Sequence, residues 1–177
     1  MKHEVISEDH SGLAWNFHVN PSSCDNPTHY EEYIRLCALQ DYISGTNTTH
    51  VFIDTENNKM CGYITLRATS LIIDDGEEKR GYPAIEISEL AVDLHYERRG
   101  IGSMMILFAY LKAIELSECH IGIEYITLCA DPKAEGFYRK SELKFEYVRD
   151  YYDLPRNGWN KNCTPMFLRI KNGPDEE

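Results

Sequence analysis

The chain has 177 residues, of which 42% are hydrophobic, so it is long enough for one domain with a sizeable core. Its formal net charge is −11, from 18 Lys and Arg against 29 Asp and Glu, which argues against a nucleic-acid partner held by a broad basic face. No apolar run approaches the roughly 20 residues needed to span a bilayer, and no signal-like segment opens the sequence, so we expect a cytoplasmic protein with no membrane partner.

The cysteines and histidines show no spacing typical of a metal site or a disulfide framework. None of the six cysteines forms a Cys-x-x-Cys pair, and the seven histidines are scattered. We therefore predict no metal, and we expect free, largely buried thiols in a reducing compartment. The cysteines are Cys24, Cys37, Cys61, Cys119, Cys129 and Cys163.

The first half of the chain predicts helices and then strands. A helix capped by Thr28, with Glu31 in a capping box, runs to Gly45. An acidic, glycine-bounded hairpin loop is predicted over residues 74–81. Strands are predicted at Val5 and Ile6 and over 50–54, 60–73 and 84–92.

A glycine loop joins the strand at 84–92 to an apolar helix that begins near Met104. The loop reads Glu97-Arg98-Arg99-Gly100-Ile101-Gly102, and Ser103 follows it. A strand, a glycine loop and a helix start in this order are typical of phosphate binding, because the first N–H groups of a helix point at the anion. No Lys follows Gly102, which excludes a P-loop, and Met105 stands where a dinucleotide fingerprint needs glycine. A third kind of glycine loop binds the pyrophosphate of coenzyme A, and the resemblance described below favours that ligand.

A second pattern follows about thirty residues later. A buried strand is predicted over 125–130, and Asp131-Pro132 then begins a helix that carries Ala134, Phe137, Tyr138 and, near its end, Leu143. Strands over 144–148 and 166–170 close the chain, and residues 173–177 form a frayed tail.

The two patterns together resemble the GNAT N-acetyltransferase superfamily. The first resembles its acyl-CoA motif, Gln/Arg-x-x-Gly-x-Gly/Ala, although Glu97 replaces the usual Gln or Arg. The second resembles its closing motif, although Asp131 replaces Asn and Lys144 replaces Gly, which suggests an altered turn before Phe145. The resemblance covers about residues 48–170 and implies an α/β (α+β) fold. It implies a single domain over 1–177, with a mixed sheet of about six or seven strands, a splayed parallel pair and helices on both faces.

The resemblance also implies acetyl-CoA as cosubstrate and assigns residues to it. Tyr138 falls at the position of the family's general acid, which protonates the departing coenzyme thiolate. The strand before the loop would pair with the pantetheine arm. The coenzyme-binding residues implied are Leu90, Ala91, Val92, Arg98, Arg99, Gly100, Ile101, Gly102, Ser103, Asp131 and Phe137.

A base must accept the proton of the attacking amine, and two strand carboxylates are candidates. Glu86 lies at the position that carries the base in histone-type relatives. Glu89 lies on the opposite face of the strand and is the weaker candidate. The resemblance implies that two segments of this chain, residues 20–45 and 151–164, line the acceptor site. The second segment carries Tyr151, Tyr152, Asp153, Trp159 and Asn160.

Three functions are consistent with the sequence. The first is an acetyl-CoA-dependent N-acetyltransferase acting on a small, cationic amine, with a homodimer as a common assembly. The second is a toxin-type GNAT protein that acetylates aminoacyl-tRNA. Runs that resemble this subgroup are 62–66, Leu90-Ala91-Val92-Asp93 and Ala130-Asp131-Pro132, with Phe17, Cys24 and Gln40, but the net charge argues against it. The third is a non-catalytic acyl-CoA-binding sensor or interaction module.

Overall fold

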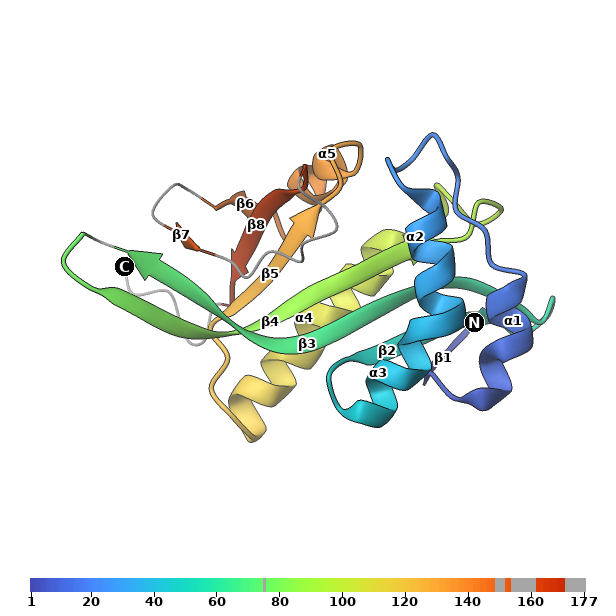
Figure 1. Cartoon of the computed structure of the whole chain (residues 1–177), viewed down its shortest axis with the longest axis horizontal. Coiled ribbons are helices and arrows are strands. Elements are labelled where there is room, and N and C mark those ends of the chain that lie inside the picture. The colour runs from blue at the N-terminus through green and yellow to red at the C-terminus, as the bar shows by residue number, and fades with distance from the viewer. Residues whose placement is uncertain (75, 149–151, 154–161, 171–177) are drawn as a thin grey trace. The chain divides into compact units, whose positions relative to one another are not determined.

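The computed structural model describes residues 1–74, 76–148, 152–153 and 162–170 (Figure 1). Two compact units divide the chain. The first comprises Met1–Arg67 and Ser88–Ile106, and the second comprises Ala68–Ile87 and Leu107–Glu177. Two long strands, β3 (Lys59–Asp74) and β4 (Lys79–Val92), and the helix α4 (Ile101–Cys119) each contribute residues to both units.

In the first unit, short helices and strands surround a core of aromatic and aliphatic side chains. β2 (Thr48–Asp54) pairs antiparallel with β1 (Lys2–Val5) and with β3. Val51 of β2 and Tyr63 of β3 are among its most buried side chains, because alternate residues of the strands point to the helical side. Phe17, which follows α1, is buried with them. The helical segments are η1 (Glu8–His10), α1 (Ser11–Trp15), α2 (Pro27–Glu32), the π-helical η2 (Tyr33–Cys37) and α3 (Ala38–Ser44).

The predicted helix over 28–45 begins differently from our expectation. Asn26, not Thr28, is the N-cap, and its side-chain oxygen accepts from the His29 N–H at 3.3 Å, with Pro27 in the first turn. Glu31 does not complete a capping box, since its carboxylate accepts from the Val19 N–H at 3.0 Å. The helix ends as predicted at Gly45, whose φ of 74° is left-handed.

The second unit contains the parallel strand pair. β4 pairs parallel with β5 (Tyr125–Ala130), from Ala84 opposite Tyr125 to Ile87 opposite Leu128. β8 (Thr164–Arg169) runs antiparallel to β5 and to β6 (Glu146–Tyr147), and β7 (Tyr152–Asp153) pairs with β3. The hydrogen-bonded order is β1-β2-β3-β4-β5-β8-β6, a mixed sheet that confirms the predicted α+β class.

The helix after β5 is shorter than predicted. α5 spans Glu135–Lys140, so Leu143 lies beyond it. Asp131 instead caps a turn, because its carboxylate accepts from the Lys133 N–H at 3.0 Å and its carbonyl accepts from the Ala134 N–H at 2.8 Å. In the described part of the chain no helix is both long and apolar enough to cross a membrane. The predicted tail over 173–177 lies outside the described residues.

Lys144, which stands where the family motif has glycine, has a left-handed backbone conformation. Its φ is 48°, in the left-handed region, and its N–H donates to the Ser141 carbonyl at 3.0 Å. The turn before Phe145 therefore holds a non-glycine residue in a strained backbone conformation.

We expect Lys144→Gly to raise the free energy of unfolding by about 1 kcal/mol, because glycine relieves the left-handed strain. Urea unfolding measures the change. Lys144→Ala is the matched control, since it removes the same charge but keeps a Cβ. Equal stability of the two variants would contradict a strained Lys144.

Candidate active site

The glycine loop presents the start of α4 in the first unit. β4 ends at Val92, residues 93–100 form turns, and α4 begins at Ile101. The Met104 N–H bonds the Gly100 carbonyl at 3.0 Å, so the preceding N–H groups of Ile101, Gly102 and Ser103 belong to the unpaired first turn. Gly100 has a φ of 80° and open space where a Cβ would stand. A phosphate can therefore approach this backbone closely, as the motif predicts.

The anomalous carboxylate of Glu97 is bound to the N-terminal segment. Its oxygens accept from the Asn20 amide at 2.9 Å and from the Ser23 hydroxyl at 2.6 Å. A carboxylate repels a phosphate group. Here the hydrogen bonds from Asn20 and Ser23 satisfy the Glu97 carboxylate within the protein. Glu97 thus connects residues 20–23 to the glycine loop by hydrogen bonds.

We expect Glu97→Gln to lower the dissociation constant of acetyl-CoA about two- to fivefold at low salt, because a negative charge near the start of α4 is removed. Isothermal titration at two ionic strengths measures the gain, which should shrink as salt rises. Glu56→Gln, an exposed carboxylate on the β2–β3 turn, is the matched control. An unchanged affinity at low salt would contradict a charge conflict at this loop.

A second set of hydrogen bonds holds the first residues of the glycine loop in place. Asp93 is buried, and its carboxylate accepts from the His18 N–H at 3.1 Å and from the His95 N–H at 2.9 Å. The Leu94 N–H returns a bond to the His18 carbonyl at 2.8 Å. Sequence analysis missed Asp93 as a positioning residue, since its partner lies 75 residues away.

The two arginines of the loop are held differently. Arg98 has a φ of 58°, so it occupies the left-handed region. The Arg99 guanidinium lies over the Tyr96 ring, 5.1 Å from its centroid. The Tyr96 hydroxyl donates to Asp54 at 2.8 Å, and this bond raises the pKa of Tyr96 to about 12. Tyr96 therefore stays neutral and keeps a cation beside the loop.

The strand segment Leu90, Ala91 and Val92 lies against β3 at a glycine. A Cβ on Gly62 would stand 2.8 Å from the Ala91 carbonyl oxygen, so glycine is required for this approach. Ala91 is buried, whereas Leu90 and Val92 are half-buried. The role of this segment in binding the pantetheine arm stays a prediction.

The two candidate bases lie in different units. Glu89 belongs to the first unit, is buried, and accepts from His29 Nε2 at 3.1 Å. Glu86 belongs to the second unit, is also buried, and lies in register with Thr127 of β5. Sequence analysis ranked Glu86 higher and did not identify His29.

The predicted general acid lies on α5 in the second unit. The Tyr138 ring is buried between Phe137, at 5.1 Å between centroids, and Phe145, at 5.9 Å. Asp131 is buried and caps the turn that leads into this helix. The aromatic contacts orient Tyr138, while its role and that of Phe137 stay predictions. Tyr151, Trp159 and Asn160 of the predicted acceptor segment lie outside the described residues, and β7 is described by its backbone alone.

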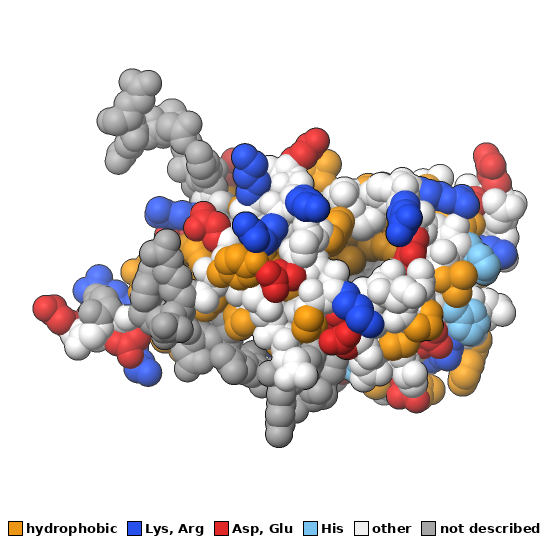
Figure 2. All heavy atoms as spheres, turned by 90° about the horizontal axis from the view of Figure 1, so that it is seen from above, with side chains coloured by type: hydrophobic (Ala, Val, Ile, Leu, Met, Phe, Trp, Pro, Cys, Tyr) orange, Lys and Arg blue, Asp and Glu red, His pale blue; other side chains and the backbone are white. Residues whose placement is uncertain are grey.

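Four basic residues lie within α5 or close to it in the sequence. Lys133, Arg139, Lys140 and Lys144 are all exposed, and the Arg139 guanidinium lies 5.2 Å from the centroid of the Tyr147 ring. Figure 2 shows Lys and Arg on the face seen from above, with acidic side chains interspersed among them. Among the described residues, no cluster of three or more His, Cys, Asp or Glu could hold a metal ion.

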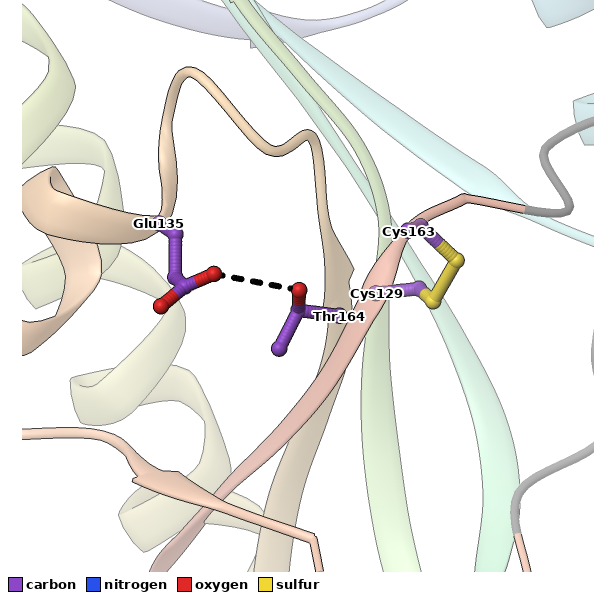
Figure 3. Close-up of a disulfide and its surroundings, with 4 residues drawn as sticks. All are labelled: Cys129, Glu135, Cys163 and Thr164. Carbon is purple, nitrogen blue, oxygen red and sulfur yellow. Dashed lines mark hydrogen bonds between the residues drawn. A yellow bond between two sulfur atoms is a disulfide. The ribbon is translucent and has the colours of Figure 1, made fainter.

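A disulfide corrects the prediction that all six cysteines are free. Cys129 of β5 is bonded to Cys163, which precedes β8 (Figure 3). The antiparallel register sets Cys129 opposite Pro165 and brings the two cysteine Cα atoms to 5.3 Å. Beside the bond, the Thr164 hydroxyl donates to Glu135 of α5 at 3.1 Å. A separation of 34 residues hid the pair from sequence analysis.

The family of the chain is shown by a match between its sequence and a protein-family model. The acetyltransferase (GNAT) family matches residues 14–143, which include the glycine loop and α5. The chain belongs to this family and is an N-acetyltransferase that uses acetyl-CoA as cosubstrate. No curated protein matches the chain.

Solved structures of toxins share the fold. A tyrosine-to-phenylalanine mutant of KacT has a TM-score of 0.74 at 14% identity, over 96% of this chain and 94% of that one. A tyrosine-to-phenylalanine mutant of AtaT, bound to the C-terminus of the antitoxin AtaR and acetyl-CoA, has a TM-score of 0.72 at 15% identity, over 96% and 92%. AtaT complexed with acetyl-methionyl-tRNA has a TM-score of 0.72 at 14% identity, over 95% and 94%.

These structures overturn the predicted partners. We expected a small amine and no nucleic acid, but the similar structures carry a tRNA in one case and an antitoxin segment in another. The prediction was wrong because it relied on the net charge of the whole chain, which does not describe the charge of one surface. The homodimer stays a prediction.

Proposed function

We propose that this chain transfers the acetyl group of acetyl-CoA to the α-amine of an aminoacyl-tRNA. The observation that carries the proposal is the similarity, over nearly the full length of both chains, to AtaT complexed with acetyl-methionyl-tRNA. The runs Leu90-Ala91-Val92-Asp93 and Ala130-Asp131-Pro132, which resemble the toxin-type subgroup, support it independently of the fold.

In this proposal the chemistry is direct transfer. The neutral amine attacks the acetyl carbonyl carbon, the C–N bond forms, and the C–S bond breaks as the coenzyme leaves as a thiolate. Tyr138 donates its phenolic proton to that sulfur and recovers a proton from solvent. The amide nitrogen loses its remaining extra proton, so the products are acetyl-aminoacyl-tRNA and coenzyme A. The N–H groups that open α4 bind the pyrophosphate.

The acidic composition is compatible with a tRNA acceptor. Residues 133–144 carry four basic and two acidic side chains, although the chain as a whole carries −11. One of the two acids, Glu135, already accepts from Thr164 and from the Tyr147 hydroxyl. Salt screens charges beyond about 10 Å at 0.1 M, so distant carboxylates oppose a phosphate near α5 only weakly. Tyr147 adds a ring for stacking.

Acetyl transfer from radiolabelled acetyl-CoA to total aminoacyl-tRNA tests the proposal. We expect label in charged tRNA and none in uncharged tRNA or in tRNA whose aminoacyl group is already acetylated. Label that is released by mild alkali, which cleaves the aminoacyl ester, places the acetyl group on the amino acid. Binding of acetyl-CoA without label in any charged tRNA would reject aminoacyl-tRNA as the acceptor.

A further inference from the structure

The glycine loop carries an acidic side chain close in sequence to the anion site that it opens. Glu97 lies in the turns just before Gly100, and α4 begins at Ile101. A carboxylate near the start of a helix is attracted to the N–H groups of the first turn, because the positive end of the helix dipole lies there. The same N–H groups are the donors that the motif assigns to the pyrophosphate. Glu97 can therefore compete with the coenzyme for them.

Two uncharged side chains engage the Glu97 carboxylate in the structure. One of its oxygens accepts from the Asn20 Nδ2 at 2.9 Å, and the other accepts from the Ser23 Oγ at 2.6 Å. Glu97 is half-buried at this position. Its carboxylate cannot turn toward α4 without giving up hydrogen bonds to a charged group, which are stronger than those between neutral groups.

The two donors are held in place before they meet Glu97. The Asn20 Oδ1 accepts from the Ser22 N–H at 2.9 Å, which leaves the Nδ2 to face Glu97. The Ser23 N–H donates to the Asn20 carbonyl at 3.0 Å, so both donors belong to one turn. Side chains that are already fixed lose little conformational entropy when they bind a partner. The turn therefore presents two fixed donors to the carboxylate.

The residues that precede this turn are anchored to the glycine loop and to α2. The His18 N–H donates to the buried Asp93 carboxylate at 3.1 Å, and the Val19 N–H donates to Glu31 of α2 at 3.0 Å. All of these residues belong to the first unit, as does the start of α4. The position of the turn beside the loop is thus set by bonds that do not involve Glu97.

We propose that Asn20 and Ser23 are positioning residues for acetyl-CoA, because they hold the Glu97 carboxylate away from the N–H groups that open α4. Without these two donors, the carboxylate accepts from those N–H groups, and the pyrophosphate meets an occupied site and a like charge. This role requires that the glycine loop bind the pyrophosphate, as the motif predicts. It goes beyond the proposed function, since it concerns the coenzyme and is independent of the acceptor.

Isothermal titration of the full-length chain with acetyl-CoA, at low salt and without acceptor, tests this role. We expect the dissociation constant to rise about tenfold when Asn20→Ala and Ser23→Ala are combined, the scale of one hydrogen bond to a charged group. In the Glu97→Gln background the same pair should change it by less than about twofold, because no carboxylate is released. A merely structural role would instead lower the fraction of chain that binds, or weaken binding equally in both backgrounds.

Two single variants are the matched controls. Ser23→Thr keeps the hydroxyl and should bind acetyl-CoA as the wild type does. Ser22→Ala changes an exposed neighbour but keeps the backbone N–H that bonds Asn20, so it should also bind normally. A dissociation constant within about twofold of the wild type in the combined alanine variant, or an equal rise in the Glu97→Gln background, would overturn the proposal.

Amide hydrogen exchange of the coenzyme-free chain is a second readout. Exchange at Ile101, Gly102 and Ser103 should be slower in the combined alanine variant than in the wild type, because the released carboxylate accepts from these amides. Exchange as fast as in the wild type would show that the carboxylate does not reach α4, and the proposal would then be wrong. Neither measurement involves tRNA, so a chain that fails to acetylate aminoacyl-tRNA still gives a decisive result for Asn20 and Ser23.

Discussion

Tyr138→Phe should reduce acetyl transfer at saturating acetyl-CoA and acceptor about a hundredfold or more, the range of a lost general acid. The hydroxyl is the only group removed, and the ring keeps its place between Phe137 and Phe145. The variant should therefore fold normally and bind acetyl-CoA with wild-type affinity. Release of free coenzyme A, followed with a thiol reagent, measures kcat directly.

Tyr147→Phe is the control for this experiment, because Tyr147 lies in the same unit, and its exposed hydroxyl bonds Glu135. It should keep most of its turnover. If Tyr138→Phe turns over as fast as the wild type, the proton reaches the sulfur by another route, and Tyr138 is only a packing residue of α5.

Strands β3 and β5 were predictable because their signal is local, whereas β4 begins at Lys79, within the predicted hairpin loop and five residues before the predicted start. β5 runs over Tyr125–Ala130, as its continuous β-branched and apolar run predicts, and β3 differs from prediction by one residue at each end. The segments η1 and α1 were missed, since together they span only Glu8–Trp15 and give too few turns for a periodic pattern. Lys144 shows a different limit: the left-handed conformation of its backbone could not be read from a residue type that rarely adopts it.

The elements that hold the candidate site were predictable only where a contiguous motif marks them. The glycine loop and Tyr138 lie in contiguous runs, so their elements could be assigned from sequence. The hydrogen bond between Asn20 and Glu97 spans 77 residues, and the contact between His29 and Glu89 spans 60. Spacing along the chain does not encode such pairs, because they depend on which elements pack together. Glu97 was recognised as a departure, but its partners required the structure.

The disulfide has the largest expected effect on stability. Cys129→Ser should lower the free energy of unfolding by about 2–4 kcal/mol under oxidising conditions, because the bond restricts a 34-residue stretch in the unfolded chain. Urea unfolding of the oxidised protein measures the loss, and Cys163→Ser should give the same value. Reduction should bring the wild type to the stability of the variants while leaving the variants unchanged.

Cys119→Ser, which removes an exposed free thiol of α4, is the control and should unfold as the wild type does. Thiol titration of the unfolded, unreduced chain supplies a second observable. It should find four reactive thiols, from Cys24, Cys37, Cys61 and Cys119, and six after reduction. Six thiols before reduction, with the same stability in both redox states, would show that β5 and β8 pair without the bond. The antiparallel register alone would then align these strands, and the approach of Cys129 to Cys163 would be its consequence.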